Sequence, residues 1–150
     1  MVKANTLAYP QKAKFYMSAS LAASAVINTS GTFTIFQNGA NASGLNPAIV
    51  ASNEKWFILN VSTPNTQTPD FIFGIVINGT PQPYSVDANT TIPTNSGKVE
   101  LSSAINGYAD AIEVEPSSNL QVTYFTLAAN GSTPVTLVGY LDVLRVPIKA

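Results

Sequence analysis

Apolar and polar residues alternate along residues 13–27, AKFYMSASLAASAVI. The odd-numbered positions from Phe15 to Ile27 are all apolar, whereas the positions between them are mostly polar or amphipathic. A period of two predicts a strand with one buried face. The alternative is an alanine-rich helix over residues 19–27, which residue propensities also allow. We favour a long, bent strand.

Further strand patterns follow at short intervals up to the C-terminus. They are rich in Val, Ile, Phe, Tyr and Thr, which fit a pleated, half-buried surface. Asn-Gly pairs and ten prolines punctuate the chain between them, as is typical of turns. The expected strands cover residues 32–37, 55–62, 71–77, 84–86, 97–101, 111–115, 120–129 and 134–148. About eight or nine strands without a convincing amphipathic helix predict an antiparallel sandwich or barrel.

The segment FIFGIVI, residues 71–77, has no charge and no proline, and it would be prone to aggregate at a free edge. We therefore expect a central strand covered on both faces, or an edge sealed by another subunit. Pro81 and Pro83 predict that the strand after it lies at a sheet edge.

The last strand, residues 134–148, is apolar on both of its alternating faces, so it needs cover on both. We expect Asp142 or Arg145 to mark where its second face meets a partner. Several large apolar residues are expected to be mostly buried, either in the domain or at an interface: Trp56, Phe57, Leu59, Phe71, Phe73, Ile75, Phe125 and Leu127.

Composition indicates how such a fold is used. With 150 residues we expect one β-sandwich domain over residues 13–150, preceded by an N-terminal arm over residues 1–12. Only 10% of the residues are charged, against roughly 25% in ordinary soluble domains. Surface charge keeps the copies of a solitary domain apart, so this composition favours burial in an assembly. A glycosylated extracellular protein and a simple low-charge domain are the alternatives.

The residue inventory excludes several chemistries. Without His or Cys the chain has no imidazole-based triad, Cys nucleophile, disulfide or zinc ribbon. No nucleophile elbow or phosphate-binding glycine loop occurs, and Asp87 with Asn89 does not have the spacing of a calcium loop. A net charge of −1 creates no strong field toward nucleic acid or acidic lipid. We expect no enzyme, no cofactor and no small-molecule substrate.

Glu113 and Glu115 are the only candidate acid pair, since a strand would place both on one face. With Asp110 or Glu100 across a cleft they would resemble a glycosidase pair. We favour a solvent-facing role for both glutamates, with Ile112 and Val114 inward. The sequence also contains Asn-x-Ser/Thr sequons, which we attribute to chance: Asn28, Asn41, Asn60, Asn78, Asn89 and Asn130.

The N-terminal arm carries Lys3 and Lys12, and Lys14 follows it. These lysines are candidates for contacts with a neighbouring subunit, with an enclosed genome or with an internal membrane, although three charges form a weak patch. The apolar run after them is interrupted by Ser18, Ser20 and Ser24 and is too short to span a bilayer. With Met1 retained, we expect synthesis in the cytoplasm of a host without a signal peptide.

The strand series from AKFYMSASL to VTLVGYLDVLRVPI covers nearly the whole chain and resembles single jelly-roll capsid proteins of icosahedral viruses of archaea and thermophilic bacteria. The resemblance implies an eight-stranded antiparallel β-sandwich, copies arranged as pentamers or hexamers, other capsid proteins as partners, and a place in the virion. It also implies that the last strand, residues 134–148, lies beside residues 13–27. A capsid decoration protein has a similar pattern. An exported cell-surface filament subunit and a carbohydrate-binding β-sandwich are the alternatives from other classes; a sugar-binding module would show exposed aromatic residues on its loops.

Overall fold

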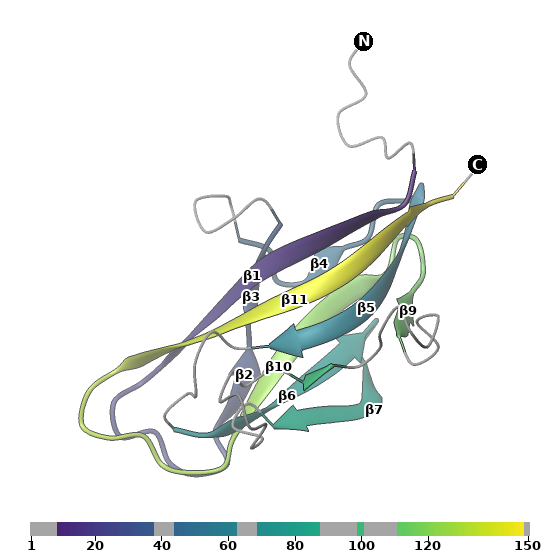
Figure 1. Cartoon of the computed structure of the whole chain (residues 1–150). Coiled ribbons are helices and arrows are strands. Elements are labelled where there is room, and N and C mark those ends of the chain that lie inside the picture. The colour runs from purple at the N-terminus through teal and green to yellow at the C-terminus, as the bar shows by residue number, and fades with distance from the viewer. Residues whose placement is uncertain (1–8, 38–43, 63–68, 88–98, 101–110, 149–150) are drawn as a thin grey trace.

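The structure is a computed structural model that describes residues 9–37, 44–62, 69–87, 99–100 and 111–148, with the backbone alone for 83–87 and 99–100. All regular structure in these residues is β-strand, arranged in two antiparallel sheets (Figure 1). The predicted all-β sandwich class is thus confirmed, and the alternative of a helix over residues 19–27 is wrong.

The six-stranded sheet is built around the two longest strands, β1 and β11, which lie side by side (Figure 1). Its order is β3–β1–β11–β5–β8, and β9 also pairs with β5. The register of β1 on β11 runs from Gln11 opposite Arg145 to Leu21 opposite Val135, which confirms the predicted pairing of the first and last long strands. The bounds are β1 Gln11–Leu21, β3 Thr34–Phe36, β5 Glu54–Ser62, β8 Val99–Glu100, β9 Ile112–Val114 and β11 Val135–Pro147.

The five-stranded sheet has the order β2–β10–β6–β7, and β4 also pairs with β10. Strand β6 is the FIFGIVI segment and is central, while β7 lies at the edge, as its prolines predict. Asn78 and Gly79 join β6 to β7 with φ angles of 51° and 80°, the combination that a tight two-residue hairpin requires. The bounds are β2 Ser30–Thr32, β4 Ala48–Ile49, β6 Phe71–Ile77, β7 Thr80–Asp87 and β10 Asn119–Thr126.

The expected strand over residues 32–37 is divided between the two sheets. Its first part, β2, pairs with β10, and its second part, β3, pairs with β1. At the junction the Phe33 N–H donates to the carbonyl of Val122 at 2.8 Å, and the Phe33 side chain is fully buried. The chain therefore passes from one sheet to the other at a core aromatic residue.

The core fills the space between the sheets with aromatic and β-branched side chains. The Phe33 ring lies 5.4 Å from Phe73 and 5.8 Å from Tyr124, and the Phe71 and Phe73 rings are 4.9 Å apart, all measured between centroids. On the inner face of β11, a Cβ added at Gly139 would lie 3.0 Å from the Phe73 ring. The absence of a side chain there allows the two sheets to approach closely.

One expectation about local structure is wrong, and a second is not met within the single chain. Strand β1 ends at Leu21, because Ser24 has a positive φ of 58° and the chain turns, leaving Val26 and Ile27 exposed. In β10 the even positions face the core, so Tyr124 is buried whereas Phe125 is 41% exposed and Leu127 is half-buried.

Phe57 is likewise not buried in the core of the single chain, and the cause is a β-bulge. In the pairing of β5 with β11, Ile58 lies opposite Val143 and Asn60 opposite Asp142, which leaves Leu59 as the extra residue. Ile58 and Leu59 are consequently both buried, and Phe57 lies on the other side of the sheet, half-buried. Trp56, Leu59, Phe71, Phe73 and Ile75 are buried as predicted.

Candidate functional site

Charged side chains gather on the six-stranded sheet. Of the charged residues whose side chains are described, all but Asp70 lie on its strands or directly after one. They are Lys12, Lys14, Glu54, Lys55, Glu113, Glu115, Asp142 and Arg145. In the five-stranded sheet, the described strands contain one charged residue, Asp87 at the end of the edge strand β7. Among the described side chains, charged residues are therefore concentrated on the six-stranded sheet.

The outer side of the five-stranded sheet has an uncharged face made of residues that point away from the core on β4, β6 and β10. Phe125 lies opposite Ile72 in register, and Gln121 lies opposite Val76. The exposed fractions of Phe125 and Ile49, 41% and 60%, are high for large apolar side chains. We define the uncharged face by Ile49, Ile72, Val76, Gln121, Thr123 and Phe125. Strand β6 is thus central, but in a single chain its outer side is only half-buried.

A polar row crosses the outer side of the six-stranded sheet. Lys14 lies opposite Asp142 in register, and Asp142 lies opposite Asn60. Lys14 Nζ is 3.9 Å from Asp142 Oδ1, and Asn60 Nδ2 donates a hydrogen bond of 3.1 Å to Asp142 Oδ2. The Lys14 ammonium group also lies 5.3 Å from the centroid of the Tyr140 ring, within cation–π range. Lys14 and Asp142 are far apart in the sequence, and only the pairing of β1 with β11 brings them together.

This row forms one wall of a pocket of about 340 Å³. The pocket is lined by Lys12, Ala13, Lys14, Leu59, Asn60, Asp142 and Val143. Its position over the Leu59 bulge explains the hollow, because the extra residue interrupts the regular ladder between β5 and β11. The carbonyl oxygen Oδ1 of Asn60 is buried here and has no hydrogen-bond partner. An unsatisfied buried acceptor costs about 1–3 kcal/mol, so this position is not optimised for stability.

Lys12 and Lys14 thus lie on β1, on the same outer side, and both line the pocket. Strand β1 begins at Gln11, so Lys12 belongs to the sheet. Lys3 lies outside the described residues. Whether the lysines contact a neighbouring subunit or a genome remains an open prediction.

Aromatic side chains continue the outer surface beyond the row. The Tyr16 ring lies 5.6 Å from Phe36 and 5.9 Å from Tyr140, measured between centroids. All three side chains are half-buried and belong to three neighbouring strands. The outer side of this sheet thus combines a cluster of tilted aromatic rings with the polar pocket.

Glu113 and Glu115 face outward while Ile112 and Val114 are buried, as predicted. Lys55 forms ion pairs with both glutamates. The hydrogen bond from Lys55 lowers the pKa of Glu113 below its ordinary value, and the same bond raises the pKa of Lys55. A general acid needs a raised pKa, so this arrangement is that of an ion-paired surface. Asp110 and the side chain of Glu100 lie outside the described part of the chain.

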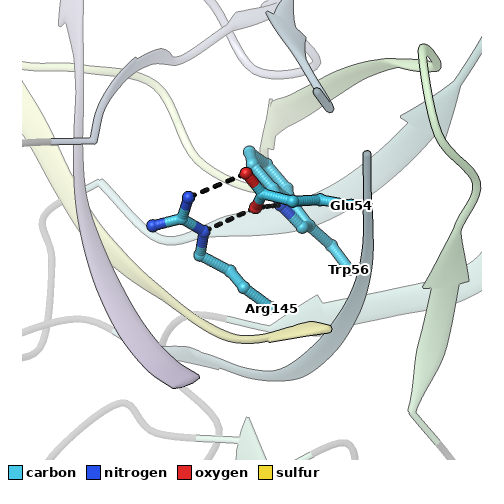
Figure 2. A network of polar contacts seen from close by, with 3 residues as sticks. All are labelled: Glu54, Trp56 and Arg145. Carbon is cyan, nitrogen blue, oxygen red and sulfur yellow. Dashed lines mark hydrogen bonds and ion pairs between the residues drawn. The ribbon is translucent and has the colours of Figure 1, made fainter. Parts of the chain in front are cut away.

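A buried carboxylate, Glu54, was not recognised in the sequence. Its side chain is 2% exposed, and Arg145 holds it with Nε at 2.8 Å from Oε1 and Nη2 at 2.9 Å from Oε2 (Figure 2). Trp56 Nε1 also donates to Glu54 Oε1 at 3.1 Å (Figure 2). Burial raises the pKa of Glu54, but the hydrogen bonds from Arg145 and Trp56 and the Arg145 charge outweigh it, so the pKa lies below its ordinary value. Arg145 therefore pairs within the chain, and the expectation that Asp142 or Arg145 marks a partner contact stays a prediction.

Several sequon asparagines use their amides inside the fold. Asn130 Nδ2 donates to the carbonyls of Ala22 and Thr133, and Asn78 accepts from the Asn119 N–H while donating to Ser118. Asn60 is engaged by Asp142 as described above. Asn28 is exposed, and Asn41 and Asn89 lie outside the described residues. The interpretation that the sequons are coincidental stays a prediction.

Within the described residues, no helix is long and apolar enough to cross a membrane, and no group of three or more acidic side chains is placed to hold a metal ion. A scan against protein-family models gave no match, and a search of curated proteins found no significant relative.

Proposed function

We propose that the chain is a single jelly-roll capsid protein, a subunit that self-assembles into an icosahedral shell around a genome. The order of strand pairing carries the proposal. The antiparallel pairs β1·β11, β2·β10, β5·β9 and β6·β7 are nested, so the first strand pairs with the last and the innermost pair is a hairpin. A long hairpin rolled up in this way is a jelly roll.

The eight positions of a jelly roll can be assigned to the observed segments. Strands β2 and β3 count as one strand divided at Phe33, and β8 and β9 count as one strand because both pair with β5. Strand β4 is then a short addition at β10. Viral capsid domains are one of the main uses of this architecture, and lectins and cupins are others, so the fold alone does not select the function.

Self-association is supported by the uncharged face. Exposed apolar residues on a surface without charge are typical of protein–protein contacts, whereas a solitary domain is kept soluble by charge. We propose that copies of the chain meet through this face. The charged side of the six-stranded sheet, which carries Lys12 and Lys14, is then available to contact other capsid proteins, the genome or an internal membrane. The proposed location is the virion.

A charge placed on the uncharged face should block assembly. The purified chain should sediment as oligomers or particles far larger than the 15.8 kDa monomer. Phe125→Lys should shift most of the protein to the monomer, because a lysine ammonium group would have to be desolvated at the contact. Thr136→Lys, at an exposed position on the outer side of β11, is the matched control and should assemble like the wild type. A wild-type chain that stays monomeric at high concentration contradicts the proposal.

A further inference from the structure

We propose that the pocket over the Leu59 bulge binds a single pyranose ring of a carbohydrate. This site is separate from the uncharged face through which we propose that copies meet, since it lies on the other sheet. A ligand can therefore reach it in the monomer and in an assembly built through the uncharged face.

The mixture of donors and acceptors selects the ligand class. Lys12 and Lys14 provide ammonium donors at the pocket wall, and the Asp142 carboxylate provides an acceptor. Asn60 adds an amide whose Nδ2 donates to Asp142 and whose buried Oδ1 has no partner. Each hydroxyl of a sugar both donates and accepts, so neighbouring hydroxyls can satisfy both kinds of group at once.

Simpler ligands match fewer of these groups. An inorganic anion would pair with the lysines but would face the Asp142 carboxylate and would offer no donor to Asn60. An amine would pair with Asp142 but would face two lysines. A neutral polyol meets no like charge in the pocket, and its hydroxyls match every polar group there.

Size and surface chemistry support the same choice. A volume of about 340 Å³ is at the lower end of the range of roughly 300–1,000 Å³ for small-ligand pockets, which suits one ring better than several. Next to the pocket, Lys14 lies over the Tyr140 ring, which in turn contacts Tyr16. These half-buried rings offer an apolar surface against which the C–H groups of an adjoining sugar can pack.

Saturation-transfer NMR tests the proposal on the whole chain and works for monomers and large particles alike. The probes are the methyl pyranosides of glucose, galactose, mannose and N-acetylglucosamine, and inorganic phosphate is titrated in parallel. At least one glycoside should bind saturably, and Asp142→Ala should weaken its binding at least tenfold. A trisaccharide ending in the same sugar should bind about as well if the natural source is the end of a glycan, and more weakly if it is the free sugar.

Glu113→Ala is the matched control, because it removes a carboxylate from the same side of the sheet outside the pocket; it should bind like the wild type. Thermal unfolding of each variant verifies that the fold is retained, and Lys14→Ala provides a second pocket variant that should also weaken binding. The proposal is overturned if no glycoside binds saturably, if Asp142→Ala and Lys14→Ala both bind normally, or if phosphate alone binds. None of these results bears on assembly, so this proposal and the capsid proposal can fail independently.

Discussion

Replacing Arg145 with Met should lower the free energy of unfolding by about 3 kcal/mol, the lower end of the range for breaking a buried ion pair. The substitution leaves Glu54 as a buried carboxylate without its cation, because Glu54 is 2% exposed and Arg145 provides both charged hydrogen bonds. We choose the lower end because the Arg145 side chain is itself 25% exposed. Urea unfolding followed by the fluorescence of Trp56, the only Trp, gives the measurement, since its indole donates to Glu54.

The double variant Glu54→Gln/Arg145→Met should recover most of this loss, because it removes the uncompensated charge and keeps an acceptor for Trp56. Lys55→Met, which breaks the solvent-exposed pair with Glu113, should have a much smaller effect. An Arg145→Met variant as stable as the wild type would show that the pair does not hold this end of the sheet.

The same pair predicts a pH dependence. The folded pKa of Glu54 is lowered, so its contribution is fully present above the unfolded value of about 4.3 and is lost as the pH falls through the folded pKa. Between neutral pH and pH 3 the wild type should therefore lose more stability than the double variant.

Truncating Phe73 to Ala should cost about 3–5 kcal/mol, the usual range for a buried phenylalanine. Phe73 is 1% exposed, contacts Phe33 and Phe71, and lies against Gly139 of the opposite sheet, so its loss leaves a cavity between the two sheets. Phe125→Ala is the matched control, since Phe125 is on the neighbouring strand but faces outward; measured on dissociated protein, it should cost about 1 kcal/mol or less. If both substitutions lowered the free energy of unfolding equally, the outward orientation of Phe125 on β10 would be wrong.

Much of the fold could be predicted from the sequence because period-two alternation and turn residues are local signals. The alternating pattern predicts β1 correctly as far as the buried Leu21. The apolar residues Ala23 and Ala25 continue the pattern, but a positive φ at Ser24 places them in a turn. The choice between Tyr124 and Phe125 in β10 could not be made locally. The even-numbered and the odd-numbered positions of β10 each include an aromatic residue. Only the pairing with β6 and the packing on Phe33 bring Tyr124 inward.

The candidate site was harder to predict because it depends on contacts between distant segments. Asn60 and Asp142 are 82 positions apart, and Glu54 and Arg145 are 91 apart. The Leu59 bulge that creates the pocket is a mismatch between two strands, so neither strand shows it alone. For the buried carboxylate the sequence contains one signal, a Glu two positions before a Trp. The same pattern fits an exposed Glu in an alternating strand equally well.

The central claim, that copies of the chain meet through the uncharged face, is tested most directly by thiol protection. The chain has no cysteine, so Thr123→Cys places a single thiol on the uncharged face, and Ser18→Cys places one at an equally half-buried position on the outer side of β1. The rate of reaction with a thiol reagent is compared between assembled and dissociated protein. The account predicts that assembly slows the reaction at position 123 at least tenfold and leaves that at position 18 nearly unchanged. Equal rates at position 123 in both states would contradict it.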